Sequence, residues 1–142
     1  FYEGIGMSSG SAPKMPGIGQ FYLAACQDAQ GHAFDGGETY RLHVPPNVPV
    51  KQFWSVTLYD IETRCLIQNK EQIADRSSHM ELVLNADGSV DVYFGPKPPT
   101  GKEPNWVQTI PGQSWFTILR LYGPLQAWFD KQWKPGEIKP VK

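Results

Sequence analysis

The chain has 142 residues, of which 40% are hydrophobic and 19% charged, which suits one globular domain and excludes a disordered chain. Its net charge is -1 and no basic run is present, so the composition argues against a nucleic-acid-binding surface. No apolar run approaches the roughly 20 residues that a membrane-spanning helix needs.

Residues 1–16 are predicted to be an irregular lead-in, and residues 17–142 to form the folded domain. The lead-in is rich in Gly, Ser, Pro and Met, a composition typical of linkers. The chain opens at Phe1 rather than Met, which indicates a processed product, a proteolytic fragment or an incomplete chain. We therefore interpret this segment as an irregular lead-in, or as a linker cut away from something upstream.

Two runs of alternating side chains predict the first strands, at residues 20–27 and 39–44. The apolar residues that share one face of the second run are Tyr40, Leu42 and Val44. Between the runs, Asp-Ala-Gln-Gly at 28–31 predicts a turn. The proline-rich segment at 45–49 ends the second strand, because proline removes a backbone donor and fixes φ.

Residues 53–68 are predicted to form a strand, a tight turn and a second strand. In the strand at 53–60, the residues expected to face the core are Trp54, Val56 and Leu58. The other face carries hydroxyls beside aromatic rings, which suits a partly covered or pocket-lining face; its members are Phe53, Ser55, Thr57 and Tyr59. Side-chain oxygens of Asp60 or Thr63 should cap backbone donors in the turn, and residues 65–68 should form the short second strand.

The segment at 69–79 is polar and is expected to be irregular, with a helical turn at 71–75. Residues 80–84 and 90–95 are predicted to be the two strands of a hairpin. The reason is that an Asp-Gly turn between two alternating runs is a strong hairpin signal.

Residues 105–110 and 115–122 are predicted to be the last strands. The second is the most apolar strand of the chain, which favours a central position, buried on both sides. One of its faces comprises Trp115, Thr117, Leu119 and Leu121. A short helix is predicted at 124–133, because Pro124 suits a first helical turn and apolar residues follow it at helical spacing.

About eight short strands separated by turn signals predict an all-β domain, either a sandwich or a barrel. A jelly roll is favoured over an immunoglobulin sandwich, because the Cys–Trp–Cys pattern is absent and a helix follows the last strand. The predicted fold is therefore an antiparallel jelly-roll-like β-sandwich with one short C-terminal helix.

Four segments in this order resemble the domain-of-unknown-function 1214 family: YRLHVPPNVPVKQFWSVTLYDIETR, NADGSVDVYFGPKPP, NWVQTIPGQSWFTILRLYGP and WFDKQWKPGEI. The resemblance covers residues 17–138. It implies a jelly-roll-like β-sandwich and an N-terminal partner domain of the domain-of-unknown-function 1254 family, to which residues 1–16 would connect. It also implies an exported bacterial protein, periplasmic or secreted. It implies no particular activity.

The sequence contains no complete catalytic or metal-binding motif. Its serines lie in no GxSxG elbow, and His32, His43 and His79 are isolated from one another. Cys26 and Cys65 lie in no CxxC or Cys/His metal pattern, and we interpret them as buried thiols, with one internal disulfide as the alternative. We therefore predict no metal site and no cofactor.

Arg120 is the residue that most suggests a binding site, because it lies in the middle of an apolar strand. A buried arginine needs a partner, which is either an acid such as Asp60 or an anionic ligand. Tryptophan and tyrosine rings on a β-sandwich can also stack against sugars, and Trp106 follows a polar loop, which favours its exposure. The candidate ligand-binding residues are Tyr59, Asp60, Thr63, Arg64, Trp106 and Arg120.

Two functional hypotheses follow. The first is a binding or interaction module that packs on its N-terminal partner domain and helps to shape a pocket for a carbohydrate or other small molecule. The second is part of a hydrolase whose active site lies at the interface with that absent domain. Self-association is also expected, because a sandwich that exposes a former domain interface should be sticky.

Overall fold

The computed structural model describes residues 2–3, 20–71, 73–125, 130 and 133–141. The strands are β1 (Tyr2–Glu3), β2 (Gln20–Ala25), β3 (Phe34–Asp35), β4 (Tyr40–Val44), β5 (Val50–Asp60), β6 (Asp75–Ser77), β7 (Val90–Gly95), β8 (Trp106–Gln108), β9 (Ser114–Pro124) and β10 (Ile138–Pro140). A short 3-10 turn, η1 (Glu103–Asn105), precedes β8. The predicted all-β class is thereby confirmed, while the jelly-roll connectivity stays a prediction.

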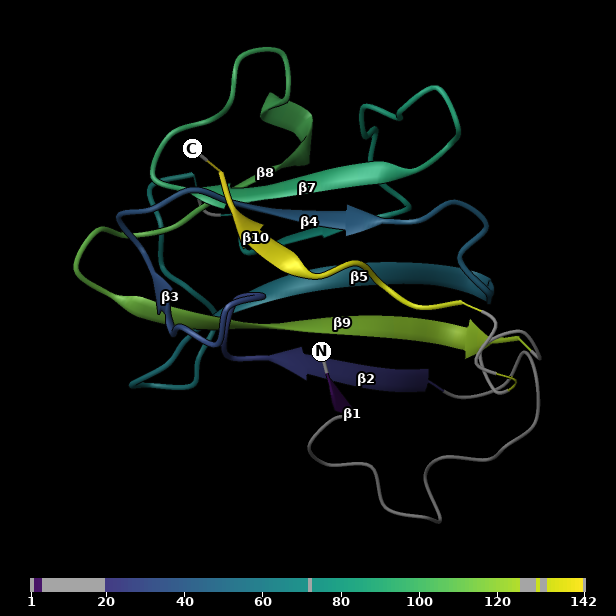
Figure 1. Cartoon of the computed structure of the whole chain (residues 1–142), viewed down its shortest axis with the longest axis horizontal. Coiled ribbons are helices and arrows are strands. Elements are labelled where there is room, and N and C mark those ends of the chain that lie inside the picture. The colour runs from purple at the N-terminus through teal and green to yellow at the C-terminus, as the bar shows by residue number, and fades with distance from the viewer. Residues whose placement is uncertain (1, 4–19, 72, 126–129, 131–132, 142) are drawn as a thin grey trace.

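Two sheets make up the fold (Figure 1). The six-stranded sheet has the order β1-β2-β9-β5-β6, with β3 also pairing with β9. The four-stranded sheet has the order β10-β4-β7-β8, in which β7 and β8 are parallel and the other neighbours antiparallel. Strand β9 lies between β2 and β5, so the predicted central position of this apolar strand is confirmed.

One hydrophobic core takes alternate side chains from both sheets. Its large, fully buried apolar residues are Trp115, Phe34, Phe94, Leu42, Leu58, Leu119, Leu121, Val44, Val56, Val92 and Val107. The core faces predicted for residues 39–44, 53–60 and 115–122 are all buried. The opposite face of β9 is only half-buried, so the prediction that this strand is buried on both sides is wrong.

Three local predictions between β5 and β7 are wrong. Residues 65–68 form an isolated bridge, Leu66 to Tyr59, rather than a strand, and β6 begins at Asp75 where a helical turn was expected. Residues 80–84 are also not a strand, although Leu84 forms a bridge to Val90 beside the predicted Asp-Gly turn. The reason is that the buried Asn105 side chain bonds the backbone of Val83 and takes the place of a neighbouring strand.

The C-terminal part departs from the prediction in two ways. Pro124, expected to begin a helix, is the last residue of β9. The rest of the predicted helix falls largely on residues 126–129 and 131–132, outside the described residues. A further strand, β10, follows the strand at 115–122 that was expected to be the last, and its Ile138 is buried beside Leu42 of β4. No helix in the described ranges has the length and apolar character needed to cross a membrane.

Candidate functional site

The predicted site residue Arg120 lies on the outer face of the six-stranded sheet, the face of β2, β9 and β5 that points away from the core. The register of the three strands places Tyr22, Arg120 and Ser55 in one row across them. Directly opposed residues of an antiparallel pair share a face, so these side chains are neighbours. Sequence alternation therefore positions Arg120 on the outer face, and strand pairing supplies its surroundings.

The guanidinium group of Arg120 lies between two tyrosine rings. Its carbon is 5.3 Å from the ring centroid of Tyr22 and 5.9 Å from that of Tyr59, within the range of cation–π attraction. One terminal nitrogen donates a hydrogen bond to the Tyr59 hydroxyl. The Arg120 Nε atom is buried and has no hydrogen-bond partner among the described residues. Among the described residues, no carboxylate lies within ion-pair distance of this group.

More aromatic rings flank Arg120 along the outer face. Tyr59 stacks on Phe116 with centroids 5.1 Å apart, and Phe53 stacks on Tyr122 at 4.1 Å. All four rings are half-buried. The outer face thus combines a cation with half-buried aromatic rings, while Ser55 and Thr57 on the same face of β5 are buried.

The predicted ion pair between Asp60 and Arg120 does not form. Asp60 lies opposite Trp115 and Arg120 lies opposite Ser55, five positions along β5, so the two are separated by about 16 Å of strand. The Asp60 carboxylate instead accepts the backbone N–H groups of Glu62 and Thr63, at 2.8 and 3.3 Å. The expected capping role of Asp60 is therefore confirmed.

Thr63 and Arg64 also serve the turn rather than the Arg120 cluster. The Thr63 hydroxyl accepts the N–H of Cys65 at 3.2 Å. Arg64 has a φ of 59° and is exposed, and its N–H donates to the Asp60 carbonyl at 2.8 Å. Of the six candidates, Tyr59 and Arg120 meet on the outer face, whereas Asp60, Thr63 and Arg64 share the turn after β5.

The expectation that Trp106 is exposed is wrong, since only 8% of this residue is accessible. Its Nε1 atom donates to the Gly95 carbonyl at 2.8 Å, across the parallel pairing of β7 and β8. The Trp106 carbonyl accepts a hydrogen bond of 2.9 Å from Nε of Arg76, which lies on β6 in the other sheet. The tryptophan therefore has a structural role and offers no platform for a sugar.

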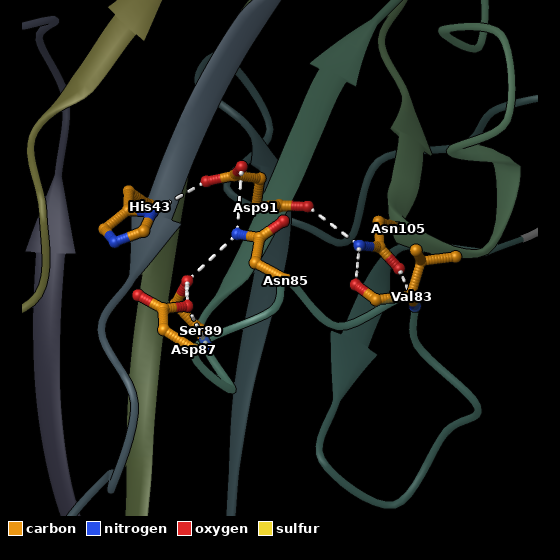
Figure 2. Close-up of polar contacts among 7 residues, drawn as sticks. All are labelled: His43, Val83, Asn85, Asp87, Ser89, Asp91 and Asn105. Carbon is orange, nitrogen blue, oxygen red and sulfur yellow. Dashed lines mark hydrogen bonds and ion pairs between the residues drawn. The ribbon is translucent and has the colours of Figure 1, made fainter.

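The outer face of the four-stranded sheet carries a polar network (Figure 2). Nδ1 of His43 lies 2.8 Å from a carboxylate oxygen of Asp91, and the Asn85 amide donates to Asp91 and to the Ser89 hydroxyl. Ser89 in turn donates to the Asp87 carboxylate from its hydroxyl and its backbone N–H, at 2.5 and 3.0 Å. Ser89 is buried, which removes it as an accessible nucleophile. The network holds the 85–88 turn against β4 and β7.

Hydrogen bonds from the Ser89 hydroxyl and N–H lower the pKa of Asp87 below its ordinary value of 3.8. A carboxyl with a depressed folded-state pKa stabilises the fold above its unfolded pKa, and that contribution is lost as pH falls through the folded pKa.

Asp87→Asn should therefore lower the free energy of unfolding at pH 7, with a smaller loss at pH 3. Urea unfolding at both values measures this. Ser89→Ala removes the hydroxyl donor and keeps the backbone N–H, so an Asp87 pKa that does not rise in this variant by NMR titration contradicts the role of the hydroxyl.

A cavity of about 510 Å³, which the sequence analysis missed, opens beside the loop between β4 and β5. Its lining joins residues 44–50 to residues 78–84, far apart in sequence, so no local pattern signals it.

Among the described residues, no group of three or more His, Cys, Asp or Glu side chains could hold a metal ion. No disulfide joins Cys26, which is half-buried, to Cys65, which is exposed, so the prediction of two buried thiols is wrong for Cys65.

Comparison with known proteins gives a family and a fold. A family model described as "Protein of unknown function (DUF1214)" matches residues 19–126. The VPA0106 protein from Vibrio parahaemolyticus is similar at 27% identity over 87% of this chain, with a TM-score of 0.73. An uncharacterised protein from Burkholderia cenocepacia shares the fold, with a TM-score of 0.59 and 21% identity over 92% of this chain. The chain spans 31% of each of these solved chains. No curated protein matches it.

Proposed function

The chain belongs to the DUF1214 family of proteins of unknown function, and we propose that it is an interaction module that binds another domain of a longer protein. The proposed partner is the N-terminal domain that the family resemblance implies. The lengths of the solved relatives support this proposal, because about two thirds of each lies outside the part that this chain matches. The proposed binding surface is the outer face around Arg120.

The observation that carries the proposal is the incomplete set of partners around Arg120. A cation held between two rings, with a buried and unpartnered Nε, bears a desolvation cost that an anion would offset. A carboxylate from the partner domain could accept two parallel N–H bonds from the guanidinium fork. Flanking half-buried rings are the residue types that interface centres favour.

Arg120→Leu is expected to weaken binding between this chain and its N-terminal partner domain by about 30-fold or more, because it truncates one side of a desolvated charge pair. Arg120→Lys should give a smaller loss, since it keeps the charge but not the planar fork. The two domains are produced separately and titrated against each other by calorimetry.

The matched control is Arg41→Leu, which removes an exposed arginine from β4 in the other sheet and should leave the affinity unchanged. Urea unfolding of each variant separates a docking defect from a folding defect. Unchanged affinity in Arg120→Leu, equal losses in the Arg120 and Arg41 variants, or no binding by the unmodified pair would each reject the proposal.

The hydrolase and carbohydrate alternatives gain no support from the site. The Asp60 carboxylate, the one acid among the six predicted site residues, is engaged by two backbone N–H groups of its own turn. Trp106, the ring expected to meet a sugar, is buried with its N–H bonded to Gly95. The surface that remains is the cationic and aromatic outer face, which fits a protein partner.

A further inference from the structure

The cavity beside the β4–β5 loop is separate from the outer face, since none of Tyr22, Tyr59 and Arg120 lines it. Its volume of about 510 Å³ lies within the range of small-molecule sites. Its apolar lining comprises Val44, Pro45, Pro46, Val48, Val50, Trp54, Met80, Leu82, Leu84 and Val90. Such a lining suits a ligand with an apolar body.

Three polar side chains, Asn47, Ser78 and Glu81, also line the cavity. Ser78 is held in place by Trp54: its Oγ accepts the Trp54 N–H at 3.1 Å, and its N–H donates to the Trp54 carbonyl at 3.0 Å. The Ser78 hydroxyl proton is not used in either bond. A fixed polar group in a mostly apolar pocket can orient a bound molecule.

Glu81 is the only ionisable residue among the described residues that line the cavity. It is exposed, and no cation of the described residues lies within ion-pair distance of it. A carboxylate at the edge of an apolar pocket attracts a cationic ligand and repels an anionic one. The Glu81 carboxylate therefore disfavours a fatty acid, although the hydrocarbon chain of a fatty acid would suit the apolar lining.

Exposed apolar side chains continue from the cavity to the surface. Leu84 has 62% of its surface exposed and Met80 has 36%. Such residues gathered beside a pocket extend the apolar contact that a bound molecule can make. The ligand need not be fully enclosed in order to bury its hydrophobic part.

We propose that this cavity binds a lipophilic amine, with the apolar body against Trp54 and the valine side chains and the ammonium group at Glu81. The Ser78 hydroxyl is placed to donate to a polar atom of the same ligand. Nothing in this assignment depends on what binds Arg120.

Three probes with one apolar body and different charges test the proposal: 4-phenylbutylamine, 4-phenylbutan-1-ol and 4-phenylbutanoate. Each is titrated into the purified chain while the methyl NMR signals of Val90, Leu82 and Met80 are followed. The amine is expected to bind about tenfold more tightly than the carboxylate, with the alcohol between them. Intermolecular NOEs from the phenyl protons to the Val90 and Leu82 methyl groups should place the probe in the cavity.

Glu81→Gln should bring the amine and the carboxylate to nearly equal affinity, whereas Glu62→Gln, an exposed change in the turn after β5, should leave their ratio unchanged. Met80→Trp, which narrows the entrance at an exposed position, should weaken all three probes. The NOE measurement uses the unmodified chain, so its result does not depend on whether a variant folds. The proposal fails if no probe gives saturable shifts, if the carboxylate binds best, or if the N-terminal partner domain shifts these signals and the probes do not.

Discussion

Trp115→Ala is expected to lower the free energy of unfolding by about 3–5 kcal/mol, the range for removing a large aromatic side chain from a core. Trp115 is fully buried in the centre of the aromatic group of the core. Its ring stacks on Phe34 at 4.1 Å and meets Phe94 and Tyr40 at 5.1 and 5.6 Å. The surrounding strands cannot close the space that alanine leaves, since they belong to two different sheets. Urea unfolding at pH 7 measures the loss.

Trp115→Phe is the matched control, because it keeps an aromatic ring and removes the indole N–H. The Nε1 atom of Trp115 is buried and has no hydrogen-bond partner in the described part of the chain, so folding removes it from water without compensation. Loss of this group offsets part of the cost of the smaller ring, and we expect a net loss of about 1–2 kcal/mol. Equal losses in the two variants would contradict the view that ring packing at Trp115 dominates.

Much of the sheet framework could be predicted from alternation alone. The runs at 39–44 and 90–95 each have one apolar face, and each contains a strand with that face in the core. A side-chain period of two is a local property, so it can be read without knowing which strands pair. The Asp-Gly turn at 87–88 could also be predicted, because the residue types of a turn are a local signal. Gly88 has the positive φ, 86°, that such a turn requires.

Features that depend on distant partners could not be predicted in this way. The segment at 80–84 alternates like a strand, but the Asn105 side chain takes the Val83 backbone bonds. The tail looks polar, yet β10 pairs with β4 and buries Ile138. Neither outcome is visible in local composition, because each depends on a residue more than 20 positions away.

The candidate site also has a part that could be predicted from local sequence and a part that could not. The need of Arg120 for a partner could be read from its place in an apolar strand, and the structure confirms its contact with Tyr59. Only the register of β5 against β9 shows that Asp60 is not the partner of Arg120. The cavity lined by Trp54 and Glu81 could not be predicted, since it forms where two distant segments meet.

Asn105→Ala is expected to cost about 3–5 kcal/mol, because it leaves several buried backbone groups without partners. Asn105 is fully buried, and its Oδ1 accepts the Val83 N–H at 2.8 Å. Its Nδ2 donates to the carbonyls of Val83 and Asp91, at 2.8 and 3.0 Å (Figure 2). The amide thus fixes the 80–84 segment onto β7, and its loss should speed hydrogen exchange at Val83.

Asn105→Asp separates the donor role of the amide from its acceptor role. The carboxylate still accepts from Val83, but its second oxygen then faces the two carbonyls that Nδ2 had satisfied. Burial and this repulsion raise the folded-state pKa of the new carboxyl above about 3.9, so the variant loses stability as pH rises through that value. Unfolding at pH 4 and pH 7 should show the larger deficit at pH 7. The control is Asn47→Asp, at an exposed position with a φ of 60° that aspartate tolerates, where little change is expected. A pH-independent deficit in Asn105→Asp would show that the two donated bonds do not hold the segment.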